Sequence, residues 1–405
     1  MEYVPELTGL RALAVFLAFS EHAAIPSLAG GWIGVDIFFV LSGYLITSIL
    51  LSEWKRTDAI RLGRFYAKRA LRLYPALILM LLLGIFFFRY LGDGGTLVGY
   101  GKTAFLGASY TQDFALGFFY QPYGNLGHTW SLAVEEQFYL FWAPVLLLLL
   151  KFGRRPAVWL VGFICLSWVS LIMTTAHTYN PPETYYRPDT RMNELFLGCL
   201  IAFLLERFKA PLARSRPLSI LMAPIGIAGI FFIEVYSNSY SRLYSYPQQE
   251  IGAGLAAGVL LIGLVIAPSA APLNRFFRLR PIVWLGTISY GIYLYFIPVI
   301  VLLNVYFGEH GWSNRDNALL AAQIVCTLGM ASLSYYLVER RFLAMKDKLN
   351  DRTAKRQPLH ARSRSTKKQP RSGINQFDRG GPGVPILGAY KVSSTAPQEH
   401  HSPPG

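Results

Sequence analysis

Long apolar stretches, separated by short polar segments, recur along the first 345 residues of the chain. The stretch from Ala157 to Ala176 is an example, and it has the length of about 20 apolar residues that a helix needs to cross a lipid bilayer. A helix in a soluble core seldom needs so long an apolar run. We therefore predict an all-α polytopic membrane protein with about ten transmembrane helices. They are expected at approximately residues 8–25, 32–52, 73–89, 130–150, 157–176, 194–205, 218–236, 250–266, 282–307 and 317–338.

Lysine and arginine are concentrated in alternate segments between these stretches. Short cytoplasmic loops of membrane proteins carry an excess of both residues. We therefore expect the basic segments to face the cytoplasm and residues 90–129, which are poor in net charge, to face the opposite side. An even number of helices places both termini in the cytoplasm, in a multi-pass protein of the inner (plasma) membrane. The first basic segment holds Lys55, Arg56, Arg61, Arg64, Lys68, Arg69 and Arg72.

The composition agrees with lipid surroundings, since 53% of the residues are hydrophobic and only 15% are charged. In a soluble protein a net charge of +15 would suggest nucleic acid as a partner, but here the charge lies in loops and near the C-terminus. We therefore expect membrane lipids as partners and no nucleic acid. The three cysteines lie inside apolar stretches without metal-ligand spacing, so neither a disulfide framework nor a metal site is predicted. The first apolar run lacks a basic leader and a small-residue cleavage site, which favours a retained helix over a signal peptide.

From about residue 346 onward the chain is rich in Lys, Arg, Ser, Pro, Gly and Gln and has no apolar period. Such a composition cannot bury enough apolar surface to order the chain. We therefore predict a membrane-embedded domain at residues 1–345 and a basic, disordered cytoplasmic tail at residues 346–405. The basic first half of this tail would be attracted to the anionic inner leaflet.

Ionisable side chains within the apolar stretches are costly in lipid and usually mark functional sites. Arg11 and His22 share one face of the first predicted helix, about 16 Å apart along its axis. Asp36 is expected at a depth similar to that of His22, where its carboxylate would hold the imidazole in one tautomer. The alternatives are that Arg11 and His22 reach the two membrane surfaces and that Asp36 bonds to a neighbouring helix end.

The basic segment before the third predicted helix also suggests a binding site. Arg69 and Arg72 are neighbours at i and i+3, so they can present two guanidinium groups to one anion such as a diphosphate. Arg64 lies in the same segment. A basic loop is also what cytoplasmic topology alone would produce.

The start of the fourth predicted helix gives the most specific local signal. Glu135 and Glu136 are adjacent carboxylates near the beginning of a membrane span, and Ser131, Glu135 and Tyr139 fall on one stripe of that helix. The positive end of the helix dipole is a structural reason for the two carboxylates. His128 precedes this helix, whereas Arg187, Arg191 and Glu194 flank the sixth predicted helix, and this second group is a candidate for binding an acceptor.

Taken together, these strings resemble the membrane acyltransferase-3 family, which contains bacterial O-acetylases of lipopolysaccharide, exopolysaccharide and peptidoglycan. The likeness covers about residues 3–345. It implies that the arginine and histidine of the first helix are essential and that acyl-CoA is supplied from the cytoplasmic side. Some members carry an additional outer esterase domain, and this chain resembles a stand-alone form. The matching strings are Leu7-Thr8-Gly9-Leu10-Arg11-Ala12 followed by His22, Gly34–Gly43, Arg69-x-x-Arg72, His128-x-Trp130-Ser131-Leu132 with Glu135-Glu136, Ser289–Leu294 and Glu339–Phe342.

The predicted reaction moves an acyl group, most simply acetyl, from acyl-CoA to a hydroxyl of a cell-envelope or exported carbohydrate. Acyl-CoA is then a co-substrate, and no cofactor is expected to be bound permanently. The coenzyme phosphates would lie at the inner side, while the pantetheine arm threads toward His22 in the outer half, which also holds Asp36, His128, Glu135 and Glu194. His22 would act as general base or as acyl carrier. The expected residues are His22, Arg11, Asp36, Glu135 and Glu136 for catalysis, Arg69, Arg72 and Arg64 for the coenzyme, and His128, Ser131, Arg187 and Arg191 for the acceptor.

A secondary transporter or flippase of a sugar-lipid intermediate is the main alternative, because it would also need charges inside the membrane. Transporters often show repeated halves with broken helices, and the sequence shows no such symmetry. Hydrolysis of acetyl-CoA by the purified protein, with and without acceptor, separates the two classes.

Overall fold

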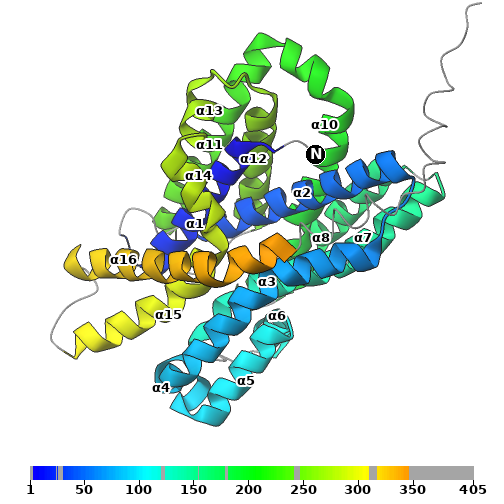
Figure 1. Ribbon diagram of the computed structural model, residues 1–405. Coiled ribbons are helices and arrows are strands. Elements are labelled where there is room, and N and C mark those ends of the chain that lie inside the picture. The colour runs from blue at the N-terminus through cyan, green and yellow to red at the C-terminus, as the bar shows by residue number, and fades with distance from the viewer. Residues whose placement is uncertain are drawn as a thin grey trace, which may run out of the picture. The chain divides into compact units, whose positions relative to one another are not determined.

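Every regular element in the described part of the chain is helical (Figure 1). The computed structural model describes residues 3–23, 25, 31–119, 124–153, 155–177, 181–240, 247–309 and 317–345. These residues belong to one structural unit, Met1–Arg352. The predicted tail, residues 346–405, lies outside the described residues. An all-α polytopic architecture is therefore confirmed.

The helices follow the predicted apolar stretches with a few differences in extent. The long helices are α1 (Pro5–His22), α2 (Ile33–Thr57), α3 (Leu62–Gly84), α7 (Trp130–Lys151), α8 (Pro156–His177), α10 (Pro188–Arg214), α11 (Arg216–Tyr240), α12 (Pro247–Ile266), α15 (Ser289–Gly308) and α16 (Asn317–Ser334). The short helices are α4 (Phe88–Leu91), α5 (Leu97–Ala108), α6 (Gln112–Phe118), α9 (Pro181–Tyr186), α13 (Pro272–Phe277) and α14 (Arg280–Thr287). A π-helical turn, Tyr335–Glu339, continues α16.

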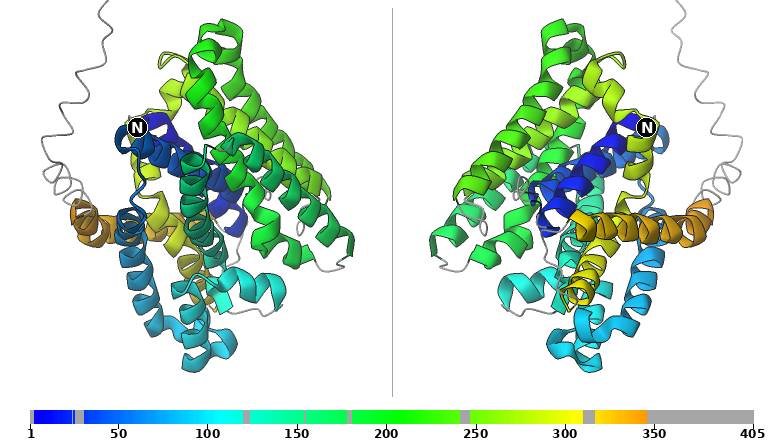
Figure 2. Two further views of the ribbon diagram at one scale, coloured as in Figure 1. Left: turned by 90° about the vertical axis from the view of Figure 1, so that its right-hand side faces the viewer. Right: turned by 90° about the vertical axis from the view of Figure 1, so that its left-hand side faces the viewer.

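Three predicted boundaries were wrong. Helix α3 begins at Leu62, because the basic segment before the apolar stretch is itself helical. The predicted helix at residues 282–307 is divided at Ile288 into α14 and α15. Residues 90–129, expected to be a loop, contain α5 and α6, which gather with α4 at one end of the bundle in both views (Figure 2).

Eight segments in the described residues are long and apolar enough to span a membrane. Helices α1 and α10 are missing from this set, since each carries more charged side chains than such a segment tolerates. Helix α1 contains Glu6, Arg11 and Glu21 among its 18 residues. These two helices contact several others, so their charged side chains meet protein as well as lipid. The eight segments are Ile33–Thr57, Leu62–Leu91, Gly124–Lys151, Pro156–His177, Arg216–Val235, Pro247–Ile266, Ser289–Gly308 and Asn317–Met345.

Glycines bring the helices around the centre of the bundle into backbone contact. A Cβ atom on Gly43 of α2 would lie 2.0 Å from the carbonyl oxygen of Leu195 of α10, and one on Gly198 would lie 2.0 Å from that of Val40. A Cβ on Gly34 would lie 2.2 Å from the carbonyl oxygen of Ala14 in α1. Only glycine permits such approaches, as is common between membrane helices. Helix α2 is thereby held between α1 and α10.

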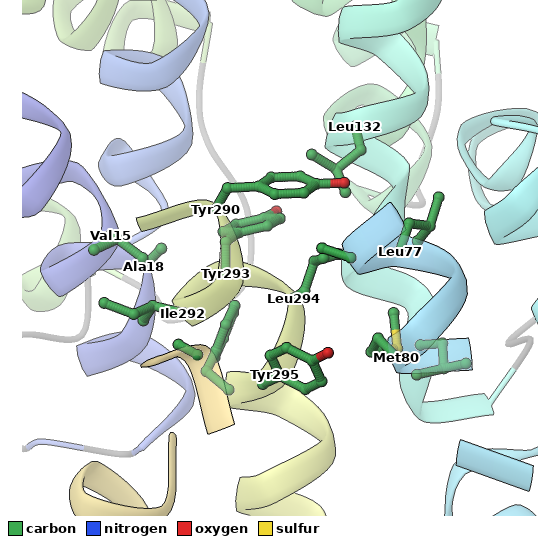
Figure 3. Close-up of a cluster of buried hydrophobic side chains, with 14 of the residues drawn as sticks. Val15, Ala18, Leu77, Met80, Leu132, Tyr290, Ile292, Tyr293, Leu294 and Tyr295 are labelled. Atoms are coloured by element: carbon green, nitrogen blue, oxygen red, sulfur yellow. The ribbon is translucent and has the colours of Figure 1, made fainter. Parts of the chain in front are cut away.

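The buried apolar side chains form three clusters, and one of them surrounds α15. Figure 3 shows Tyr290 extending from α15 toward Leu132, with Leu77 of α3 below Leu132 and Met80 of α3 across from Tyr295. The outer faces of several helices are apolar instead, as at Leu166, which is 67% exposed, and Phe232, which is 70% exposed. Apolar side chains on the outside fit lipid surroundings, and the protein is a multi-pass membrane protein.

Candidate active site

A cavity of about 420 Å³ lies between α1, α2, α3, α7 and α15. Among its lining residues Tyr3 and Ile49 are exposed and Tyr290 is buried. The cavity therefore runs from the surface into the helix bundle. Five of its polar side chains come from four helices that are far apart in sequence. These are Arg11 of α1, Ser42 of α2, Arg69 and Arg72 of α3, and Glu135 of α7.

The three arginines of this cavity differ in their partners. Arg69 donates from Nε and Nη2 to Oε1 of Glu136, at 3.2 and 3.1 Å, and its guanidinium carbon lies 3.4 Å from the centre of the Tyr139 ring. Arg11 and Arg72 make no hydrogen bond to another described residue. A guanidinium group carries five N–H donors, so these two side chains retain donors for a ligand in the cavity. The sequence had correctly placed Arg69 and Arg72 near one another.

Carboxylates balance the arginines around the cavity. Ser42 Oγ donates to Glu135 Oε1 at 2.7 Å, which fixes that carboxylate at the cavity wall. Glu339, from the π-helical turn, is buried, accepts from Ser334 Oγ at 3.1 Å and interacts electrostatically with Arg72 and Arg11. With Glu136 there are three carboxylates for three guanidinium groups, so burial of the arginines is compensated without a ligand.

A smaller chamber of about 50 Å³, called the inner chamber, continues the cavity deeper into the helix bundle. The two spaces share five lining residues, which define the junction between them: Arg11, Phe38, Ser42, Glu135 and Tyr290. Beyond this junction lie Ser131 and Tyr293, whose hydroxyl oxygens are 2.6 Å apart. The predicted stripe of Ser131, Glu135 and Tyr139 is confirmed, since all three residues line these two spaces. The sequence had placed Glu135 in the outer half with His22, but the structure places it beside the arginines.

His22 and His128 both pack on the ring of Phe296. The ring of Phe296 is 5.1 Å from that of His22 and 5.6 Å from that of His128. Nδ1 of His22 lies 2.9 Å from the carbonyl oxygen of Ala18, and Nε2 of His128 lies 3.2 Å from that of Leu294. Because a carbonyl oxygen only accepts, each of these nitrogens carries a proton, and in a neutral ring the other nitrogen holds a lone pair. Neither histidine lines the cavity or the chamber.

Asp36 does not contact His22, so this part of the prediction was wrong. Its carboxylate pairs with Arg191, whose side chain is 0% exposed. The same guanidinium group lies 3.6 Å from Glu194 and 3.2 Å from Glu250. Arg191 therefore joins α2, α10 and α12, and its predicted contact with an acceptor stays a prediction.

Two further predicted residues lie away from the cavity. Arg187 forms a two-pronged ion pair with Asp189, at 3.0 and 2.9 Å. Arg64 precedes Arg69 by more than one helical turn and does not line the cavity. Neither position supports or excludes binding of a ligand by these side chains.

Five residues of the site were not among those assigned a role from the sequence, and one of them is Ser42, which holds Glu135. Phe38, Tyr290 and Tyr293 shape the junction and the chamber, and Glu339 faces the arginines. The strings Ser289–Leu294 and Glu339–Phe342 had been noted as family matches, and this was the available signal. Phe38 is an apolar residue in an apolar stretch, so nothing in its local pattern distinguishes it.

The chain is similar to known proteins over most of its length. A family model described as an acyltransferase domain matches residues 4–339 of the chain. The peptidoglycan O-acetyltransferase OatA of Listeria monocytogenes is 34% identical over 361 residues, which are 84% of this chain and 55% of that protein. The O-acetyltransferase OatA of Staphylococcus aureus is 32% identical over 83% of this chain and 57% of its own length. The putative peptidoglycan O-acetyltransferase YrhL of Bacillus subtilis is 33% identical over 84% of this chain and 54% of its own length.

The chain spans little more than half the length of these curated relatives. No solved structure matches it. The match to the family model covers all the helices that line the cavity.

Proposed function

Because the chain belongs to the membrane acyltransferase-3 family, we propose that it transfers an acetyl group from acyl-CoA to a hydroxyl of a cell-envelope carbohydrate. Peptidoglycan is the acceptor that the names of two relatives, OatA of Listeria monocytogenes and YrhL, support. We favour it for that reason over lipopolysaccharide and exopolysaccharide. Peptidoglycan lies outside the plasma membrane, so the reaction would join a cytoplasmic donor to an external acceptor.

The cavity with its three arginines is the observation that supports the proposed donor. A coenzyme phosphate would accept from Arg11 and Arg72, which have N–H donors without a described partner, and Arg69 would stay on Glu136 and Tyr139. Since the arginines and carboxylates balance, the phosphate competes with Glu135 and Glu339 for the guanidinium groups. The pantetheine arm then points toward the junction at Phe38 and Tyr290.

At the end of the pathway beyond the chamber, His22 is the candidate base. Its Nε2 lone pair would take the proton of the acceptor hydroxyl, and the resulting alkoxide would attack the carbonyl carbon of the thioester. The carbon–sulfur bond then breaks, the thiolate leaves, and the proton on His22 passes to that thiolate. The products are the ester and the free thiol of the coenzyme. Because Tyr293 lines the chamber and Phe296 packs on both Tyr293 and His22, we infer that this transfer requires these rings to move aside.

A second route has His22 as acyl carrier, with an acyl-imidazole formed before the acceptor binds. Both routes use the same cavity and the same histidine. They differ in whether radioactive acetyl remains on the protein when the acceptor is withheld.

Donor binding is tested most sharply at Arg72. Replacing Arg72 by Ala should weaken the affinity of the purified protein for acetyl-CoA about ten- to a hundred-fold, the usual cost of losing hydrogen bonds to a charged group. Isothermal titration in lipid nanodiscs measures this affinity. Lys151→Ala, at the exposed end of α7, is the matched control and should bind normally. Wild-type affinity in folded Arg72→Ala and Arg11→Gln proteins would remove the donor site and favour the transporter class.

A further inference from the structure

A second hollow, separate from the cavity, lies between α2 and α10 toward their C-terminal ends. It has a volume of about 520 Å³ and shares no lining residue with the cavity. Leu45 and Ile49 line the cavity on one face of α2, whereas Tyr44 and Leu51 line this groove on another. The two helices touch at Gly43, and the groove lies beyond this contact along both helices.

The floor of the groove is apolar. Tyr44 and Leu51 of α2 and Ala202 and Leu205 of α10 are each 4–6% exposed. Apolar side chains beside the groove face outward, since Leu204 is 38% exposed and Phe208 is 43% exposed. The floor therefore continues into surface that fits lipid chains.

The rim of the groove is basic. Lys55 of α2 forms an ion pair with Glu206 of α10. Arg56 and Lys209 also line the groove, and both are exposed. One carboxylate among three cations leaves a net charge of +2 at the rim.

The position of the rim restricts the kind of ligand. Both helices change there from apolar to basic residues, which is the pattern at a membrane–water interface. Anionic lipids attract such basic residues. A ligand that fits the groove must combine a phosphate group with an apolar chain.

We propose that this groove binds an anionic phospholipid, with its phosphate at Arg56 and Lys209 and an acyl chain along the floor. The bound lipid would bridge α2 and α10. These helices carry Ser42, which holds Glu135, and Asp36 and Arg191, which hold the bundle together. Phosphate could also be supplied by the coenzyme, so the experiment separates the two sources.

The experiment uses the full-length protein, purified in detergent and stripped of lipid. Native mass spectrometry with added phosphatidylglycerol should show one tightly bound lipid, and the unfolding temperature should rise more than with phosphatidylcholine of the same chains. Each charge removed by Arg56→Gln or Lys209→Gln should weaken phosphatidylglycerol binding about five-fold. The control, Lys151→Gln with Arg155→Gln, removes two exposed cations outside the groove and should bind lipid as the wild type does.

Three results would overturn the proposal. One is equal binding of phosphatidylglycerol and phosphatidylcholine. Another is wild-type lipid binding by the single variants, which are conservative enough to fold. The third is a loss of acetyl-CoA affinity in those variants with lipid binding intact, which would assign the groove to the coenzyme. Acetyl-CoA affinity is otherwise expected to be unchanged, so failure here is distinct from failure of the proposed transferase function.

Discussion

His22 and His128 present opposite nitrogens to their surroundings although they pack on the same phenylalanine ring. The carbonyl oxygen of Ala18 fixes the proton of His22 on Nδ1, whereas the carbonyl oxygen of Leu294 fixes that of His128 on Nε2. A base must hold its lone pair toward the hydroxyl that it deprotonates. His22 therefore offers Nε2, at the tip of its ring, and this is the nitrogen with the longer reach.

Replacement of His22 by Ala tests this role directly. General-base catalysis is commonly worth about a hundred- to ten-thousand-fold, so acetyl transfer should fall by that order while acetyl-CoA binding is retained. Steady-state transfer and donor affinity are measured on the same folded protein. Near-normal turnover in a donor-binding His22→Ala protein would contradict the role and leave Glu135 or His128 as the base.

Asp113 gives a prediction for how the stability of the protein depends on pH. It is 0% exposed at the start of α6, outside the membrane-spanning segments. Burial raises the pKa of its carboxyl from 3.8 to about 7, and a hydrogen bond from Gln137, 2.9 Å long, opposes the rise. The folded state therefore binds the proton more tightly than the unfolded state. Its contribution to stability is complete below about pH 4 and is lost as the pH rises through about 7.

The wild-type unfolding temperature should thus contain a component that falls between about pH 4 and pH 7. Asp113→Asn keeps an acceptor for Gln137 but has no titratable group, so it should reduce this dependence and be the more stable protein at high pH. Thermal unfolding in detergent across this range measures both. Identical slopes in the two proteins would show that Asp113 does not titrate as inferred.

Individual site residues were predictable from the sequence where a charged side chain in an apolar stretch is costly in lipid. Arg11 and Glu135 are such residues, and charged side chains inside apolar stretches usually mark functional sites. The partner of Asp36 was not predictable, because periodicity gives the depth and face of a residue but not the helix opposite. Arg191, its partner, is 155 residues away in the chain.

Helices α2 and α10 act as a pair at the scale of elements. Their glycines bring the backbones together, and Arg191 joins both to α12 through three carboxylates. Three buried carboxyl groups therefore share one guanidinium group. Removing the cation therefore takes a partner from three buried carboxyl groups at once, whereas removing one carboxyl group leaves the guanidinium group with two.

Arg191→Gln should accordingly lower the free energy of unfolding by about 3–5 kcal/mol, the usual cost of breaking a buried ion pair. Glu194→Gln is the matched control, and it should be neutral or stabilising. Unfolding temperature and folded yield in detergent measure the difference. Equal losses in both variants would show that the charge balance of this cluster is not as described.

The helices themselves were predicted well where an apolar run was long. Helix α3 was cut short because its basic first part has no apolar run, and α5 and α6 were missed because they are short. The break at Ile288 lies in a uniformly apolar stretch, so neither charge nor a turn residue indicates it. Apolar runs therefore locate spans but not the amphipathic or interrupted helices beside them.

At the scale of the whole molecule, the cavity exists because five helices from distant parts of the sequence meet. No local sequence pattern indicates that α1, α3 and α15 are neighbours. The approximate depth of individual residues was therefore predictable, but the cavity that they share was not. From the basic loops we predict that the mouth of the cavity lies on the cytoplasmic side.

The most direct test follows acetyl transfer in membrane vesicles of the two orientations. Acetyl-CoA labelled in its acetyl group is supplied either to the face with the basic loops or to the opposite face. With the donor at the basic face, wild-type protein should transfer the label to envelope carbohydrate as an alkali-labile ester, and His22→Ala should not. With the donor at the opposite face, no transfer is expected. Absence of ester-linked label when folded wild-type protein receives donor at both faces would contradict the proposed reaction.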